Sequence, residues 1–202
     1  MTKVVLINGP ARSGKDTLAK EAKKHFLSAY EFKFADVMHN FWQDVFFSMH
    51  DYGEAVDRTD GDLKSDPSPV LGLSYRQCMI ATSEEFIKPI LGNDFFGRLT
   101  AAHIAKGEAL ERELYTSDPN FQYVALVSDS GFKEEAVAVI EKFGAENVLL
   151  LHLYRNGYTY SGDSRGYIHL DEFGVKTVNL ENITLEQFTR EGVQIIRDFV
   201  EA

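Results

Sequence analysis

The feature that most constrains this 202-residue chain is a glycine-bounded turn between an apolar run and a helix-forming segment. The turn runs from Gly9 to Gly14, it follows the run Val4 to Ile7, and Lys15 comes directly after it. The spacing G-x-x-x-x-G-K lets backbone N–H groups point inward around phosphate oxygens while the lysine reaches the terminal phosphates. A helix that begins at Lys15 adds its unpaired N–H groups and the positive end of its dipole. The sequence therefore predicts a phosphate-binding P-loop, and the alternative is a chance lysine after a glycine-rich turn.

The position after the lysine departs from the usual P-loop, in which a Ser or Thr hydroxyl binds Mg²⁺. Asp16 stands there, and the hydroxyl comes one residue later at Thr17. Either side chain can take the metal role, so both are predicted ligands of Mg²⁺. The residues predicted to hold ATP are Gly9, Ala11, Arg12, Ser13, Gly14, Lys15, Asp16 and Thr17.

The charge balance limits the partners of such a site. The chain has 21 Lys and Arg residues against 31 Asp and Glu residues, a net charge of −10. Such a surface repels nucleic acid polymers and anionic membranes, which argues against a helicase or packaging ATPase. Cys78 is the only cysteine, which excludes an internal disulfide and a multi-cysteine zinc site. No apolar stretch approaches the roughly 20 residues of a membrane span and no signal peptide is recognisable, so we expect a cytoplasmic protein.

Strand-like and helix-like segments alternate along most of the chain. The expected strands cover residues 2–8, 30–34, 121–128, 147–154 and 175–180, and helices are expected over 15–27, over 134–143 and after a capping box at 184–187. This alternation predicts a P-loop-type α/β fold, a three-layer sandwich with a five-stranded parallel sheet and right-handed crossovers. The ligand of such a sheet lies at the carboxyl ends of its strands.

The interval 36–119 is too long for an ordinary strand connection, so it is predicted to be a helical region within one domain whose core is 1–35 and 120–202. Two stretches, Ser74–Gln77 and Thr82–Glu85, have capping-box spacing and predict two abutting helices. The apolar ridges of 37–49 are expected to pack as core, and a base-stacking wall is the alternative. The Asp-rich segment 51–73 is predicted to be a loop. Its acidic spacing does not match the twelve-residue EF-hand loop, which makes calcium binding a weak alternative.

A carboxylate follows the third predicted strand, in the stretch Ser128-Asp129-Ser130-Gly131. At the carboxyl tip of a strand beside the P-loop strand, a carboxylate orders Mg²⁺ and water in P-loop enzymes. Asp129 is therefore the Walker B candidate and the third predicted Mg²⁺ ligand. The alternative is that Asp129 caps the next helix, and both roles can hold together.

Two arginines lie in the polar, Gly-rich segment after the fourth predicted strand. Arg155 begins this segment, and Arg165 lies in its middle. A loop that carries two cations toward a phosphate site suits a lid, over about 155–173, that closes on a transferring phosphoryl group. The alternative is a surface loop with ordinary solvated arginines.

Several separated stretches together resemble the phage-type deoxynucleoside monophosphate kinases, a branch of the adenylate-kinase-like P-loop kinases. They are, in chain order, Arg12–Thr17 with its Asp after the lysine, Phe34–Asp36, Arg76–Gln77, Glu85–Lys88, Gly92–Phe96, Ser128–Phe132 with Glu134 and Glu135, and His169–Gly174. Lys88 and Gly131 stand where the family has arginines. A lysine keeps the charge of arginine but not its bidentate fork.

The resemblance implies transfer of the γ-phosphoryl group of ATP to a (deoxy)nucleoside monophosphate, with ATP and Mg²⁺ as cofactors. It implies acceptor contacts from Asp36, Arg76, Glu85 and Lys88, and a catalytic group of Lys15, Arg76, Arg155, Arg165 and Asp129. The expected partners are then small nucleotides, not nucleic acid polymers or membranes. A homodimer is possible on this reading. The expected location is the host cytoplasm if the chain is phage-encoded. The alternatives are a P-loop kinase of another small molecule, a catalytically weak nucleotide-binding relative and, against the net charge, a nucleic-acid motor.

Overall fold

The computed structural model describes residues 1–115, 121–163 and 165–202. The chain divides into two compact units, unit 1 (Met1–Phe34 and Phe96–Ala202) and unit 2 (Ala35–Phe95). The helical region expected over 36–119 is thus divided, because most of helix α6 (Phe95–Leu114) packs with unit 1. Residues 116–119 of that region and Ser164 of the predicted lid lie outside the described residues.

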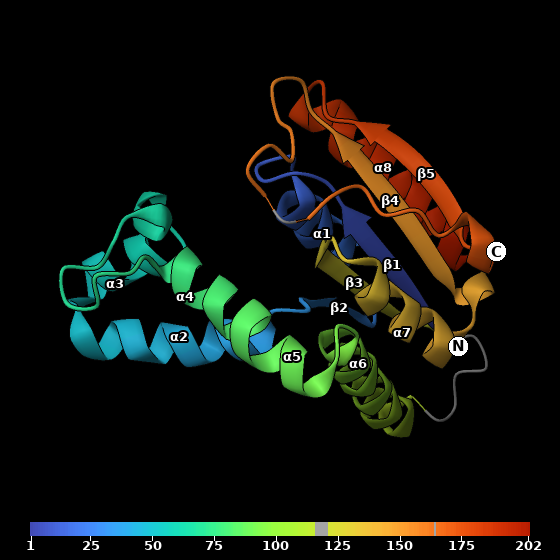
Figure 1. Cartoon of the computed structure of the whole chain (residues 1–202). Helices are drawn as coiled ribbons and strands as arrows, with labels where there is room; N and C mark the ends of the chain where they lie inside the picture. The colour runs from blue at the N-terminus through green and yellow to red at the C-terminus, as the bar shows by residue number, and fades with distance from the viewer. Residues whose placement is uncertain (116–120, 164) are drawn as a thin grey trace. The chain divides into compact units, whose positions relative to one another are not determined.

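Unit 1 is built on a five-stranded parallel sheet (Figure 1). The strands are β1 (Thr2–Asn8), β2 (Ala29–Phe32), β3 (Tyr123–Ser130), β4 (Val148–Tyr154) and β5 (Lys176–Glu181), in the spatial order β2-β3-β1-β4-β5. Each strand pair in this order is parallel. Val4 to Asn8 of the central strand are fully buried, as expected for a parallel strand that is covered on both faces. The predicted α/β fold class, with a five-stranded parallel sheet, is confirmed.

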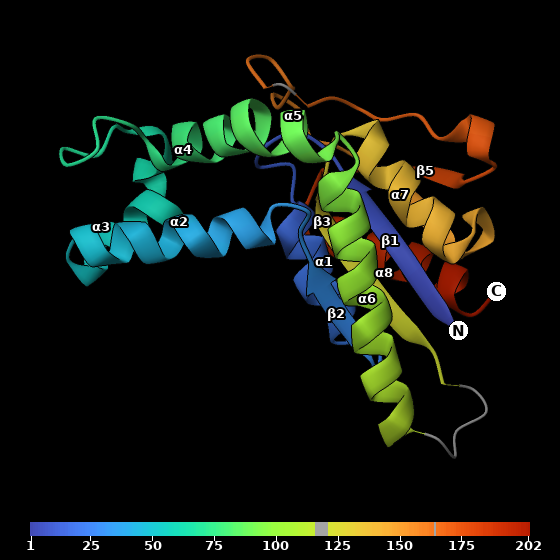
Figure 2. The same ribbon diagram turned by 60° about the horizontal axis from the view of Figure 1, so that its bottom comes forward.

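Helices cover both faces of this sheet and complete three layers (Figure 2). Helices α1 (Lys15–Lys23) and α8 (Leu185–Val200) pack on one face, where Leu18 and Phe188 join Val5 and Ile7 in one buried cluster. Helices α6 and α7 (Lys133–Phe143) lie on the other face. Two single 3-10 turns, η3 (Ala145–Asn147) and η4 (Asp171–Phe173), precede β4 and β5. The period-2 alternation of β1 therefore sends successive side chains into two separate helix–sheet interfaces.

Unit 2 is helical. Its elements are α2 (Asp36–Met49), α3 (Tyr52–Thr59), the 3-10 turn η1 (Asp62–Ser65), α4 (Tyr75–Ala81), the π-helical segment η2 (Thr82–Ile87) and α5 (Lys88–Leu91). Phe46, Tyr75 and Cys78 form a small buried cluster, and Trp42 packs against it. Phe46 and Trp42 of α2 thus pack into this small core, whereas Phe41 on the same helix is 58 % exposed.

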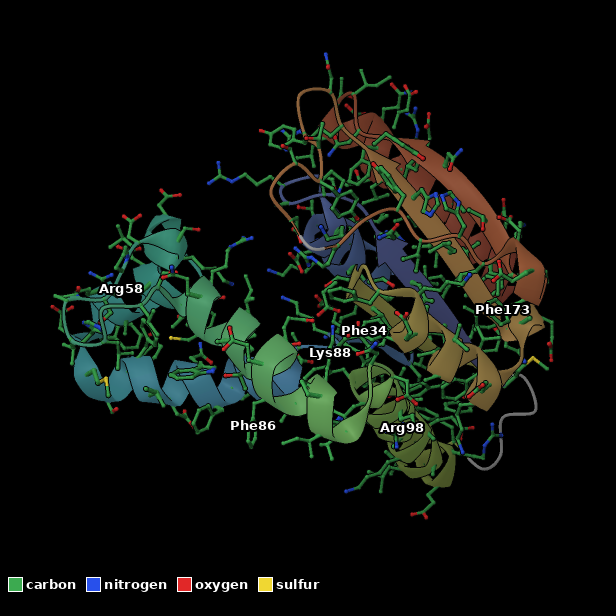
Figure 3. The ribbon with its side chains drawn as sticks, viewed as in Figure 1. Phe34, Arg58, Phe86, Lys88, Arg98 and Phe173 are labelled. Atoms are coloured by element: carbon green, nitrogen blue, oxygen red, sulfur yellow. The ribbon has the colours of Figure 1, made fainter. Side chains whose placement is uncertain are left out.

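The prediction that residues 51–73 form only a loop is wrong, because α3 and η1 lie within it. The Asp51 side chain caps α3 by accepting a 3.0 Å hydrogen bond from the Glu54 backbone N–H. Arg58 on α3 is buried and pairs with Glu54 at 2.7 Å (Figure 3). Its guanidinium also donates to the carbonyls of Asp66 and Pro67 at 3.3 and 3.2 Å, which ties the chain after η1 to α3.

The helices expected to start at Ser74 and Thr82 form one continuous run. Ser74 makes the predicted capping box with Gln77, with both reciprocal hydrogen bonds present. Thr82 has helical backbone angles, φ −62° and ψ −43°, so it begins no helix. Its hydroxyl instead accepts a 2.9 Å hydrogen bond from the Trp42 indole on α2. The Thr82 hydroxyl, which the local spacing predicted to cap a helix, is therefore engaged in a tertiary hydrogen bond instead.

Among the described residues, no helix is both long enough and apolar enough to cross a membrane.

Candidate phosphate-binding site

The predicted strand–turn–helix is present at the carboxyl end of the central strand. The turn ends at Gly14, whose φ of 107° is a left-handed conformation that glycine adopts without strain. A Cβ at Gly14 would lie 2.8 Å from the Asn182 amide nitrogen and 3.0 Å from the Phe188 ring. Asn182, which follows β5, donates a 2.9 Å hydrogen bond to the Ser13 carbonyl. The turn is therefore held from its outer side by the segment after β5.

Lys15 begins α1, and its side chain folds back over the turn. Its ammonium donates to the carbonyls of Gly9 and Pro10, each at 2.7 Å. The side chain is buried, and this burial, together with the positive charge of Arg165, lowers the pKa of Lys15 to about 8. Asp16, Asp129 and Asp163 oppose that shift. The Lys15 ammonium thus interacts electrostatically with one arginine and with three carboxylates from separate segments.

Asp16 faces the carboxyl end of β3. Its carboxylate accepts a 2.9 Å hydrogen bond from the Ser128 hydroxyl and lies 3.3 Å from the Lys33 ammonium. Burial alone would raise the pKa of Asp16, but the Lys33 charge and the Ser128 hydrogen bond outweigh it, so the pKa is lowered. Thr17 is exposed on the first turn of α1. Asp16 is therefore an ionised carboxylate at the edge of the turn.

Asp129 lies near the end of β3, the strand that pairs with β1. Ser130 is opposite Asn8 in this pairing, so Asp129 lies one residue before the level of Asn8, where the register shifts between Leu6 and Asn8. Its carboxylate accepts a 2.8 Å hydrogen bond from the Phe34 backbone N–H. The N-cap of α7 is Phe132, so Asp129 is not the capping residue that the alternative required. The strand next to β1 thus carries a carboxylate near its carboxyl end, as the sequence predicted.

The two arginines after β4 both lie on the P-loop side of unit 1. Arg155 donates a 2.7 Å hydrogen bond to the Arg12 carbonyl, and its guanidinium lies 4.6 Å from the centre of the Tyr158 ring. Arg165 is held by Asp163, whose carboxylate accepts from Nε at 2.9 Å and from Nη2 at 2.7 Å. Arg155 therefore contacts the turn itself, and the positive charge of Arg165 helps to lower the pKa of Lys15.

Sequence reasoning missed Asn8, the last residue of β1. This fully buried amide donates to the Ser130 carbonyl at 2.8 Å, the Tyr160 hydroxyl at 2.9 Å and the Gly166 carbonyl at 3.0 Å. Its own oxygen accepts a 3.1 Å hydrogen bond from the Ile168 N–H. Asn8 thereby joins the P-loop strand, β3 and the segment 160–168. The signal in the sequence was a single polar residue that closes an apolar strand directly before Gly9.

The predicted acceptor residues belong to unit 2. Asp36 is the first residue of α2, Glu85 lies in η2, and Arg76 and Lys88 lie in α4 and α5. Lys88 is buried and donates a 2.8 Å hydrogen bond to Glu84, whereas Phe86, two residues earlier in the same helical run, is exposed (Figure 3). Arg76 is exposed. Twelve residues of one helical run separate Arg76 from Lys88, which corresponds to about 18 Å along the axis. The acceptor contacts of these residues remain a prediction.

The residues at the turn fit Mg²⁺ bound in its usual way. Within the described part of the chain, no three His, Cys, Asp or Glu side chains form a group that could hold a metal alone. Mg²⁺ does not need such a cage, because it keeps several waters and is bound by one or two carboxylates together with phosphates. Asp16 and Asp129 supply two carboxylates near Lys15, with the Ser128 hydroxyl hydrogen-bonded to the first of them.

No family model and no curated protein matches this sequence. Among solved structures, the chain is similar to a sugar kinase from Janibacter sp. HTCC2649 that was solved in its unliganded form. The two chains share 15 % sequence identity with a TM-score of 0.46, over 100 % of this chain and 95 % of that chain.

Proposed function

We propose that this chain binds Mg·ATP at the turn Gly9–Gly14 and transfers the γ-phosphoryl group to a (deoxy)nucleoside monophosphate. The observation that carries the proposal is the position of Lys15. It lies at the carboxyl end of the central strand of a parallel sheet, against the turn carbonyls and within the field of Asp16, Asp129 and Arg165. Polyanions bind at such strand ends and helix N-termini.

The donor half of the reaction uses the turn and the first residues of α1. Backbone N–H groups of the turn and the α1 N-terminus bind phosphate oxygens, and Lys15 reaches the β- and γ-phosphates. Asp16 and Asp129 would hold Mg²⁺ directly or through water, with the Thr17 hydroxyl as the alternative ligand. A bound Mg²⁺ would neutralise the charge that develops on the phosphate oxygens.

The acceptor half needs no strong general base. A phosphate monoester has a second pKa near 6, so its attacking oxygen is already charged at neutral pH. Catalysis then consists of positioning and electrostatic stabilisation. Arg155 and Arg165 are the cations proposed to act on the transferred group. The resemblance to nucleoside monophosphate kinases supports Asp36, Arg76, Glu85 and Lys88 as acceptor contacts.

The test compares the wild-type protein with Lys15→Ala in a coupled assay of ADP release, over a panel of nucleoside monophosphates and non-nucleotide acceptors. Lys15→Ala should lower turnover by about a hundredfold or more, because a preorganised cation is lost. Its circular dichroism spectrum and melting temperature should show an intact fold. Lys20→Ala is the matched control, since Lys20 is an exposed lysine on the same helix.

Three outcomes would change the proposal. Full activity of Lys15→Ala would remove the turn from the mechanism. Transfer to a non-nucleotide acceptor alone would leave a P-loop kinase of another small molecule. Binding of Mg·ATP by calorimetry without transfer to any acceptor would leave a nucleotide-binding relative without kinase activity.

A further inference from the structure

Gly131, the residue that follows β3, lies directly against the side chain of Arg165. A Cβ built on Gly131 would lie 2.7 Å from Cδ of Arg165 and 2.9 Å from both its Cβ and its Cγ. Real Cβ atoms essentially never come within 3.0 Å of another heavy atom. The missing side chain at position 131 is therefore what makes room for the methylene groups of Arg165.

Two further residues fix the same arginine. The Asp163 carboxylate accepts from the Arg165 backbone N–H at 3.1 Å as well as from Nε and Nη2 of its guanidinium. Asn8 binds the carbonyl of the following residue, Gly166, at 3.0 Å. The Asp163 side chain is only 14 % exposed and that of Arg165 26 %, so this pair is largely withdrawn from solvent. Arg165 is thus held at its backbone, at its stem and at its guanidinium.

The guanidinium also has capacity left for a ligand. Asp163 accepts from two of its five N–H donors, and an arginine can donate the other three to a second acceptor such as a phosphoryl group. Its positive charge lowers the pKa of Lys15 and is attracted by the carboxylate of Asp129. A cation that is already in position costs no reorganisation when charge develops in the transition state.

We propose that Gly131 is a positioning residue that, with Asp163 and Asn8, seats Arg165 in advance as the second cation of the phosphate site. Arg165 then acts without requiring closure of the segment 155–173. This inference rests on the proposed phosphoryl transfer. It concerns the geometry of one arginine, and no covalent step beyond that transfer is involved.

A double-mutant cycle tests the inference with wild type, Gly131→Ala, Arg165→Ala and the double variant. Arg165→Ala should lower kcat about a hundredfold. Gly131→Ala should lower kcat about tenfold or more with little change in the KM for ATP, since it displaces a transition-state contact. The double variant should be no slower than Arg165→Ala, because Gly131 acts only through Arg165.

Gly53→Ala is the control for the added methyl group. A Cβ on Gly53 would meet only Asp51 Oδ1 at 3.6 Å, and Gly53 is not one of the predicted site residues, so this variant should keep nearly full activity. Asp163→Asn is the second variant, for the case in which Gly131→Ala does not fold. It loosens the grip on the guanidinium without a clash, and its loss of kcat should likewise disappear in the Arg165→Ala background.

Wild-type kinetics of Gly131→Ala and Asp163→Asn, or losses that multiply with that of Arg165→Ala, would overturn the inference. If the wild type transfers phosphate to no acceptor, the proposed function fails. The same cycle is then read from calorimetric affinity for inorganic tripolyphosphate. Non-additive losses of affinity would still support the inference that Gly131 positions Arg165, and additive or absent losses would refute it.

Discussion

The Ser128 hydroxyl donates a 2.9 Å hydrogen bond to the carboxylate of Asp16. This contact joins the residue after the P-loop lysine to the end of β3, one residue before Asp129. In the usual P-loop the position after the lysine carries the hydroxyl and the neighbouring strand carries the carboxylate. Here the position after the lysine carries a carboxylate, Asp16, and the end of the neighbouring strand carries a hydroxyl, Ser128, beside its carboxylate Asp129.

We predict that Asp16→Asn raises the Mg²⁺ concentration needed for half-maximal phosphoryl transfer about tenfold or more, since even residues that only hold a metal ligand in place contribute about tenfold or more to metal affinity. The amide oxygen can still accept the Ser128 hydrogen bond, so the fold should be kept. Initial rates against free Mg²⁺ measure the effect. Asp44→Asn, an exposed position on α2, is the control. An unchanged Mg²⁺ dependence would assign the metal to Thr17 or Asp129.

Asn8→Ala should destabilise the protein by about 2 to 4 kcal/mol, because it leaves buried carbonyl and N–H groups of Gly166, Ser130 and Ile168 without partners. Denaturant unfolding measures the loss. Asn156→Ala, at an exposed position, should change stability by less than about 0.5 kcal/mol. Equal stability of the two variants would show that Asn8 does not anchor the segment 160–168.

Gly97→Ala should destabilise unit 1 by about 3 kcal/mol, at the upper end of overpacking costs. A Cβ at this position of α6 would lie 2.2 Å from the Glu135 carbonyl oxygen and 2.6 Å from its Cα, and backbone atoms of α7 cannot swing away. Thermal unfolding measures the change. In Gly53→Ala, on α3, the new Cβ meets only Asp51 Oδ1 at 3.6 Å. That control should be neutral or stabilising by about 0.5 to 1 kcal/mol, the helix preference of Ala over Gly.

The stability of the protein should fall on acidification partly through His152. Burial lowers the pKa of this side chain from its ordinary 6.5, and its Nε2 donates a 2.8 Å hydrogen bond to the Ile168 carbonyl in the neutral form. Because the unfolded chain binds the proton more readily, the stabilisation is complete above pH 6.5 and is lost as the pH falls toward the lower folded pKa.

His152→Phe removes this titration, so its free energy of unfolding should depend less steeply on pH between about 5 and 7 than that of the wild type. Urea unfolding at a series of pH values gives the comparison. His103→Gln, at an exposed position on α6, is the control. Parallel curves for wild type and His152→Phe would contradict the prediction.

Local chemistry explains which elements could be predicted. The turn Gly9–Gly14, Lys15 and the Ser74 capping box each depend on residues within a few positions of one another, so their spacing determines the backbone. The capping box expected at Thr82 has the same spacing, yet the Trp42 indole binds that hydroxyl. The helical content of 51–73 was missed for a similar reason, since the buried Arg58 binds Glu54 on its own helix and also the carbonyls of Asp66 and Pro67 after η1.

Gly131 illustrates the limit of residue-by-residue reasoning at the site. In the sequence it is a position where the resemblance expects a cation, and the charge is absent. In the structure the side chain of Arg165, 34 residues later, lies against that position. An arginine from a different segment of the chain therefore lies beside the position where the resemblance expects one.

By itself the sequence determined the parallel α/β fold, the turn Gly9–Gly14 and the strand that carries Asp129, because hydrophobic period and short motifs act over neighbouring residues. Only the tertiary structure decided that Asn8 anchors the segment 160–168, that Ser128 holds Asp16 and that Arg165 is seated on Gly131. Each of these contacts joins residues that are far apart in the chain. Their geometry follows from how the strands and loops converge at one edge of the sheet, which no local pattern encodes.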